Sequence, residues 1–231
     1  MSLKILSGGA AASAVKGIQA DFEKETNCVL DGHFSAVGEM RDALLEGAPC
    51  DVVILTKTLI QQLIDSGQVR AGSARSLGKV QTGIAVKEGS PSPQVSSRES
   101  LTQAFRQARA IYCPDTIKST AGIHFMRVLT ELGLKEEVQN RLREFANGAT
   151  AMQAMADCDE TNLLGCTQAT EINYTPGVVL VAHLPKEFEL ATDYTLGICS
   201  QSKQDALAAK LAEWLTGPQS AAIRRQGGFE F

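Results

Sequence analysis

Four short turns of small or hydroxyl-bearing residues carry the chemistry that this chain could do. Each stands where a strand should pass into a helix: Ser7-Gly8-Gly9-Ala10, Ser35-Ala36-Val37-Gly38, Ser119-Thr120-Ala121-Gly122 and Asn147-Gly148-Ala149-Thr150. The first turn of a helix has N–H groups without an intrahelical partner, and the helix dipole makes this end positive. It can therefore hold an anion without a charged side chain. We expect a site for a small anion where these turns converge, although a single turn is explained equally well by close packing of a helix on a sheet.

Histidine and cysteine are the other residue types that could do chemistry. His33, His124 and His183 lack the spacing of metal ligands, so we expect no metal site. His33 and His124 stand beside two of the turns, where an imidazole could donate to an anion. Cys166 ends an apolar run, but no histidine or lysine adjacent in the sequence activates it. We expect no catalytic residue and no cofactor, and keep as the alternative an enzyme that uses Cys166, His33 or His124.

The six cysteines form no CxxC pair, and several lie in apolar runs, which is typical of buried free thiols. Free thiols favour a reducing compartment. Cys158 and Cys166 flank a short polar loop and are the one pair that could close a disulfide. Met1-Ser2-Leu3 leads directly into the first expected strand, so a native cytoplasmic start and a start that replaces an export signal both stay open.

Composition places the chain among ordinary globular proteins. It has 231 residues, of which 44% are hydrophobic and 21% charged, and a formal net charge of −4. The lysines and arginines are scattered singly, so nucleic acid is not an expected partner. No apolar stretch approaches the roughly 18 residues of a membrane span, so we expect no membrane insertion. An anionic ligand is compatible with the negative net charge, because local dipoles set the field at a binding site.

Strand and helix patterns alternate along most of the chain. The run Asp51-Val52-Val53-Ile54-Leu55 predicts a strand buried on both faces, and apolar residues at helical spacing follow it. Short connections between such units predict an α/β fold with mainly parallel sheets flanked by helices. The Ser- and Pro-rich stretch from Gly89 to Ser100 predicts a surface loop, and we expect a helix from Val138 to Phe145.

Several phrases in fixed order resemble a known family. They are the opening strand with its small-residue turn, Glu46-Gly47-Ala48-Pro49-Cys50-Asp51, Thr120-Ala121-Gly122-Ile123, and Leu215-Thr216-Gly217-Pro218-Gln219-Ser220-Ala221-Ala222 with Gly227-Gly228-Phe229. Together they resemble the molybdate-binding substrate-binding proteins of ABC importers, which have the type II periplasmic-binding-protein fold. The resemblance covers almost the whole chain. No single one of these motifs is specific to the family, but their order and spacing taken together are.

The resemblance implies two α/β lobes, with two crossover strands as a hinge. The first lobe would take residues 1–83 and 197–231, and the second residues 84–196. A small anion would be captured in the interlobe cleft by closure of the lobes, and the partner would be an ABC permease if the protein is exported. A cytoplasmic binding or sensing module of the same fold stays open. We expect a monomer.

The resemblance also implies which residues would bind the ligand. The family holds its oxyanion with backbone N–H groups and with hydroxyl side chains, and the positions matching three of these hydroxyls are Ala10, Val37 and Gln168. All three have lost the hydroxyl. Ala121 matches a backbone contributor. The full expected set is Ser7, Gly8, Gly9, Ala10, Ser35, Ala36, Val37, Ser119, Thr120, Ala121, Ala149, Thr150 and Gln168. The ligand implied is a molybdate-like oxyanion, with a carboxylate or another organic anion as the alternative.

Overall fold

The computed structural model describes residues 1–231, and the chain divides into two compact units. Unit 1 comprises Met1–Lys79 and Thr192–Phe231, and unit 2 comprises Val80–Ala191. The chain thus passes between the units twice, once within strand β4 (Arg75–Lys87) and once at the start of strand β9 (Ala191–Ile198). The boundaries expected from the sequence, at 83/84 and 196/197, fall a few residues further along the same two strands.

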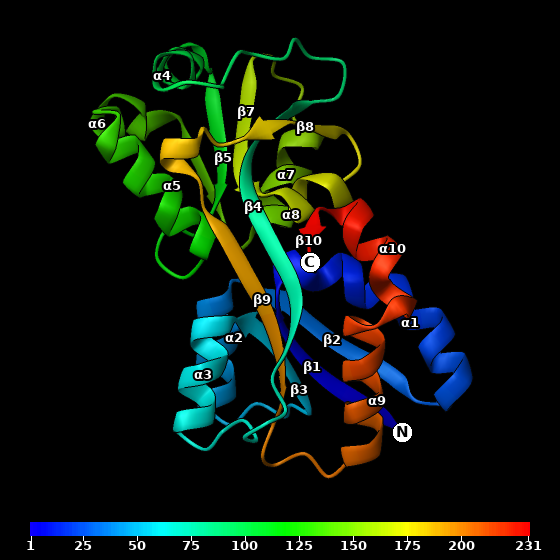
Figure 1. Cartoon of the computed structure of the whole chain (residues 1–231). Coiled ribbons are helices and arrows are strands. Elements are labelled where there is room, and N and C mark those ends of the chain that lie inside the picture. The colour runs from blue at the N-terminus through cyan, green and yellow to red at the C-terminus, as the bar shows by residue number, and fades with distance from the viewer. The chain divides into compact units, whose positions relative to one another are not determined.

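Unit 1 is a sheet with helices on both faces. Its strands β1 (Ser2–Gly8), β2 (Val29–Ser35), β3 (Val52–Thr56) and β9 lie in the order β2-β1-β3-β9. Strands β2 and β3 pair with β1 in parallel, and β9 is antiparallel to β3. Figure 1 shows α1 (Ala12–Thr26), α9 (Asp205–Thr216) and α10 (Pro218–Gly227) on one face, and α2 (Val37–Leu45) and α3 (Lys57–Asp65) on the other. A short strand, β10 (Phe229–Glu230), pairs with β4.

Two buried charges hold the C-terminal part of unit 1 in place. Asp51, from the Gly-Ala-Pro-Cys-Asp phrase, accepts from the Lys4 backbone N–H at 2.8 Å and from the Ser202 hydroxyl at 2.6 Å. Arg224 is 2% exposed, and its guanidinium donates to Leu77 O at 2.6 Å and Thr216 O at 2.9 Å. Because buried charges require such partners, Asp51 and Arg224 have structural roles.

Unit 2 has the same plan. Its strands β5 (Ala110–Pro114), β6 (Leu142–Phe145), β7 (Leu163–Gln168) and the end of β4 lie in the order β6-β5-β7-β4, and β8 (Val178–His183) also pairs with β4. Strands β6 and β7 are parallel to β5, and β4 is antiparallel to β7. The helices are α4 (Arg98–Gln107), α5 (Thr120–Glu131), α6 (Lys135–Val138), α7 (Gly148–Asp157) and α8 (Ala169–Tyr174).

Alternating side chains give unit 2 a core on each face of its sheet. Ile111, Cys113 and Leu164 face one core, which is completed by α4, α5 and α6. Ala110, Tyr112 and Leu163 face the other, together with apolar residues of α7 and α8. Successive strand residues point to opposite faces. The nearly continuous apolar runs in the sequence therefore supply both cores.

Two expectations about unit 2 are wrong. Residues 138–145 are not one helix, because α6 ends at Val138 and β6 begins at Leu142, where it pairs in parallel with β5 from Ile111 onward. The loop expected from Gly89 to Ser100 ends earlier, because the Ser97 side chain accepts from the Ser100 N–H and caps α4, which begins at Arg98. Both differences concern the edge of the unit 2 sheet or its connections.

The strand order of each unit defines where its loops gather. In unit 1 the chain runs from β1 outward to β2 and then returns to the other side of β1 for β3. In unit 2 it runs from β5 to β6 and then to β7 on the other side of β5. Ligands of open α/β sheets bind beyond the carboxyl ends of the strands at such a reversal. By this rule, a ligand site is expected near the ends of β1 and β3 in unit 1, and near the ends of β5 and β7 in unit 2.

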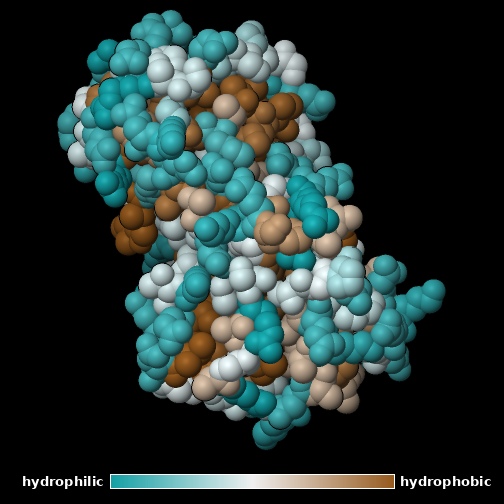
Figure 2. Space-filling view, viewed as in Figure 1, coloured by the Kyte–Doolittle hydropathy of each residue, from teal (hydrophilic) through white to brown (hydrophobic).

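Figure 2 shows a visible face on which hydrophilic residues predominate and apolar residues lie in separate patches. No helix of the chain is both long enough and apolar enough to cross a membrane.

Candidate anion-binding site

Unit 1 brings two of the predicted turns together. The register of β1 and β2 places Gly8 opposite Ser35, so the starts of α1 and α2 are neighbours. A single 3-10 turn (Gly9–Ala11) precedes α1, and no side chain caps it; none caps α2 either. The first backbone bond of α2 runs from Met40 N to Ala36 O, so the preceding N–H groups have no intrahelical acceptor. These two starts form the unit 1 half-site.

Gly8 allows the two starts to approach closely. A Cβ on Gly8 would lie 2.6 Å from Val37 Cγ1 and 3.3 Å from Tyr194 Cε1, so only glycine fits without a shift. Tyr194, which is 3% exposed, thus packs at the unit 1 half-site. No sequence pattern indicates this tyrosine as a site residue. Its place at the half-site follows from the pairing of β9 with β3, in which Tyr194 lies opposite Thr56 at the end of β3.

The serines of the unit 1 half-site already have partners. Ser7 is fully buried and its hydroxyl donates to Gly8 O at 2.9 Å. The Ser35 hydroxyl donates to Glu39 Oε2 at 2.5 Å, which brings a half-buried carboxylate to the first turn of α2. Ala10, Ala36 and Val37 are buried and offer only backbone N–H groups. Among the predicted site residues of unit 1, the donors left for a ligand are therefore backbone groups, beside the negative charge of Glu39.

The start of α5 is the corresponding feature of unit 2. Ser119 is the residue before the helix, and no side chain caps this end. The first backbone bond runs from Ile123 N to Ser119 O, which leaves the N–H groups of Thr120 and Ala121 without an intrahelical acceptor. A Cβ on Gly122 would lie 2.2 Å from Asp115 O, so a glycine is required for α5 to start this close to the end of β5.

The start of α7, the fourth predicted turn, is occupied by the protein's own groups. The Asn147 side chain accepts from the Thr150 N–H at 2.9 Å and from the Thr150 hydroxyl at 3.0 Å. The N–H groups of Gly148 and Ala149 donate to the carboxylate of Glu171, which also accepts from the Thr167 hydroxyl at 2.6 Å. Burial raises the pKa of Glu171, and these hydrogen bonds oppose the rise by stabilising its charged form. The backbone N–H groups of Ala149 and Thr150 therefore already have acceptors within unit 2.

Buried polar residues gather at the end of β7. Gln168 is 2% exposed and stands immediately before α8. It pairs with Thr82 on β4. The hydroxyls of Thr82 and of Thr170 have no hydrogen-bond partner, although each residue is 1% exposed. The unit 2 half-site thus comprises the start of α5 and these three residues.

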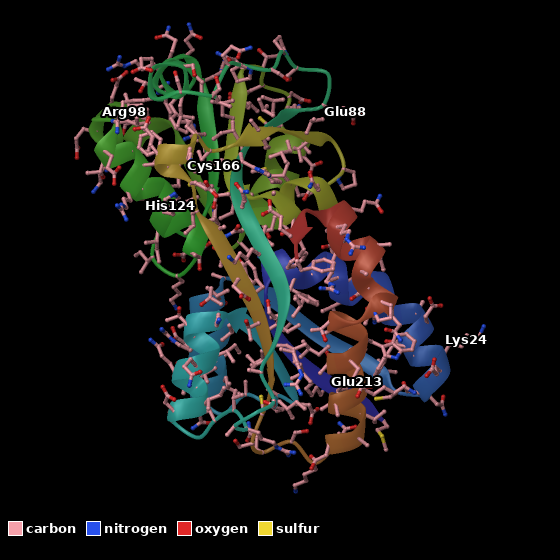
Figure 3. All side chains as sticks on the ribbon, in the orientation of Figure 1. Lys24, Glu88, Arg98, His124, Cys166 and Glu213 are labelled. Atoms are coloured by element: carbon pink, nitrogen blue, oxygen red, sulfur yellow. The ribbon has the colours of Figure 1, made fainter.

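The residues considered for catalysis lie outside both half-sites or lack the necessary activation. Figure 3 shows Cys166 within the strands of unit 2 and His124 on α5. Burial raises the pKa of Cys166, which keeps it a protonated thiol. His124 Nε2 lies 2.7 Å from Phe188 O, and His33 is exposed on β2. All six cysteines are free, including Cys158 and Cys166, and no group of three metal-ligating side chains exists.

A cavity of about 430 Å³ lies elsewhere in unit 2, lined by the Ser90–Pro93 loop and by residues that include Val86, Ala104 and Leu164. None of its lining side chains is charged, and none belongs to the half-sites.

Each unit is an open α/β sheet with uncapped helix starts beyond the carboxyl ends of its strands. This arrangement is typical of ligand-binding α/β proteins. The chain belongs to the bacterial extracellular solute-binding protein family, whose model matches residues 3–230. It is 25% identical over 238 residues to an aconitate isomerase from a Pseudomonas species, covering 99% of this chain and 87% of that protein. The family and the fold are those of transport solute-binding proteins, as the sequence resemblance predicted.

Two solved structures show the likeness of fold. The periplasmic molybdate-binding protein of Azotobacter vinelandii has a TM-score of 0.81 at 19% identity, with 99% of each chain covered. The L-phospholactate-bound PEB3 protein, from Campylobacter jejuni, has a TM-score of 0.69 at 12% identity, again with 99% of each chain covered.

Proposed function

We propose that this protein is a solute-binding protein that binds a small organic anion with two or more carboxylates at its uncapped helix starts and delivers it to an ABC permease. The observation that carries the proposal is the set of uncapped helix starts at α1, α2 and α5, with no lysine or arginine among the residues of either half-site. Such starts bind carboxylates and oxyanions through backbone N–H groups.

The donor set favours a carboxylate over molybdate. A buried tetrahedral dianion needs nearly every oxygen satisfied, and each hydrogen bond to a charged group contributes about 1.5–3 kcal/mol. Ala10 and Val37 supply no hydroxyl, and Ser35 already donates to Glu39. The Glu39 carboxylate also adds negative charge at the start of α2. A polycarboxylate separates its charges along a carbon chain, so only part of its negative charge needs to lie beside Glu39.

The names of similar proteins support a small anion as ligand. They include a molybdate-binding protein, a protein bound to L-phospholactate, which carries a carboxylate and a phosphate, and an isomerase of aconitate, which is a tricarboxylate.

A thermal-shift screen tests this ligand class. The panel is molybdate, tungstate, sulfate, phosphate, citrate, tricarballylate and trans-aconitate, because a ligand stabilises the folded state by RT ln(1 + [L]/Kd). We expect the largest rise in melting temperature with a di- or tricarboxylate. A large rise with molybdate alone would contradict the proposal and would restore the oxyanion as the ligand.

A second candidate function is isomerisation of such a polycarboxylate, favoured by the 25% identity to aconitate isomerase over 99% of the chain. Among the residues of the half-sites and their immediate partners, Glu39 offers a general base, because its half-buried carboxylate sits at the start of α2 and accepts from Ser35. It would take a proton from a carbon beside the double bond and return it at another carbon. Incubation with trans-aconitate, followed by proton NMR in D₂O, tests this. Unchanged trans-aconitate without deuterium exchange leaves binding as the function, whereas turnover that Glu39→Gln abolishes establishes the enzyme.

A further inference from the structure

Two threonine hydroxyls in unit 2 are buried without any hydrogen-bond partner. Thr82 and Thr170 are each 1% exposed, and neither Oγ1 donates or accepts within the protein. A buried polar group without a partner destabilises the folded state, so native proteins rarely retain one without a reason.

The neighbouring threonines show how this region normally satisfies a hydroxyl. Thr167 donates to Glu171 Oε2 at 2.6 Å, and Thr175 donates to Glu171 O at 2.7 Å. Both are buried, at 0% and 6% exposed. The fold around α8 thus provides acceptors for hydroxyls that have no other task, and it provides none for Thr82 or Thr170.

The two hydroxyls stand at the edge of the sheet where unit 2 has its free helix donors. Thr82 lies opposite Gln168, the last residue of β7, and Thr170 follows Gln168 by two residues. β7 is the parallel neighbour of β5, and the carboxyl end of β5 leads into the uncapped start of α5. The free backbone N–H groups and the two unpartnered hydroxyls therefore lie at the same end of three neighbouring strands, β5, β7 and β4.

We infer that Thr82 and Thr170 are ligand-binding residues that determine specificity, and that their hydroxyls donate to the oxygens of a carboxylate held by the start of α5. This inference rests on the proposed function and assigns two donors that the helix starts alone do not include. It also explains why the protein tolerates two unsatisfied groups, since a bound carboxylate supplies their acceptors.

Isosteric substitution separates this role from a structural one. In Thr82→Val and Thr170→Val, we expect the ligand-free protein to melt at the same temperature as wild type or higher, because no hydrogen bond is lost. Calorimetric titration with the polycarboxylate that gives the largest thermal shift should show a Kd about tenfold to a hundredfold weaker for each. Thr82→Ser, which keeps the hydroxyl, should retain most of the affinity. Thr175→Val is the matched control: it loses a bond to Glu171 O, so it should melt lower and bind as wild type does.

Each outcome decides a separate question. Lower ligand-free melting temperatures for Thr82→Val and Thr170→Val, similar to that of Thr175→Val, would show that the hydroxyls are satisfied and would overturn the inference. Unchanged affinity in both valine variants would overturn it as well, while wild-type binding left the proposed function standing. If wild type binds no polycarboxylate in the panel, the proposed function and this inference both fail.

Discussion

At the scale of single residues, two glutamates distinguish helix starts that would otherwise be equivalent. Glu171 places its carboxylate against the first N–H groups of α7, and a Cβ on Gly148 would lie 2.0 Å from Glu171 Oε2. Glu39 reaches back along α2 to Ser35 instead. A carboxylate is a favourable partner of a helix N-terminus. The Glu171 carboxyl group is therefore a built-in acceptor at the start of α7, which leaves the N–H groups of Gly148 and Ala149 no free capacity for a ligand.

Glu171 should make stability depend on pH in a defined direction. Because burial raises its pKa above the usual 4.5, the folded protein binds a proton that the unfolded chain has already released. This contribution is present below about pH 4.5 and is lost as the pH rises through the folded-state pKa. Urea unfolding of Glu171→Gln across this range should lack that decline.

At any one pH the Glu171→Gln variant should also be less stable, by about 1–3 kcal/mol, because its amide NH₂ must face backbone N–H donors. The exposed Glu136→Gln is the control and should follow wild type. Equal pH profiles for Glu171→Gln and wild type would refute this assignment.

At the scale of elements, the four predicted turns differ in what they offer. The starts of α1, α2 and α5 have no side-chain cap, whereas Asn147 and Glu171 occupy the start of α7. The sequence indicates the turns through their small residues, but it cannot show that Glu171, more than twenty positions after Asn147, returns to the same helix start. That contact depends on β7 lying beside β5.

Adding hydroxyls at the starts of α1 and α2 should shift ligand selectivity toward molybdate. We expect Val37→Ser, and the double variant with Ala10→Ser, to bind molybdate more tightly than wild type. Each restored hydroxyl should improve the Kd by about tenfold if its hydrogen bond to the anion forms. Ala149→Ser is the matched control, because the N–H groups of that helix start already bind Glu171. Calorimetric titration with molybdate measures the affinity of all three variants. An equal gain in affinity in Ala149→Ser would show that the gain does not depend on which helix start carries the added hydroxyl.

Element boundaries show where sequence patterns are insufficient. Val138, Leu142 and Phe145 recur at helical spacing, yet Leu142–Phe145 is a strand because it pairs with β5 and because Phe145 stacks on Tyr112 with ring centroids 5.9 Å apart. Tertiary pairing overrides local periodicity in such short segments. The buried strands β3, β5 and β7, by contrast, are evident from their continuous apolar runs.

At the scale of the whole molecule, both units repeat one strand order. The orders β2-β1-β3-β9 and β6-β5-β7-β4 each place the first strand of the unit between its second and third, and each ends on an antiparallel strand through which the chain passes between the units. This repeat explains why helix starts with free N–H groups occur in both halves of the chain. The family and the α/β class could be predicted from the sequence because they depend on ordered phrases and alternation, whereas the donors at each helix start depend on contacts between distant residues.

Competition calorimetry tests the central claim most directly. Wild-type protein is titrated with trans-aconitate, citrate and tricarballylate, and then with molybdate both before and after saturation by the tightest of these. We predict that one polycarboxylate binds at a single site per chain, more tightly than molybdate, and that its presence suppresses the molybdate signal. Tighter binding of molybdate, or no heat from any polycarboxylate, would contradict the claim that the backbone donors of this protein serve an organic anion.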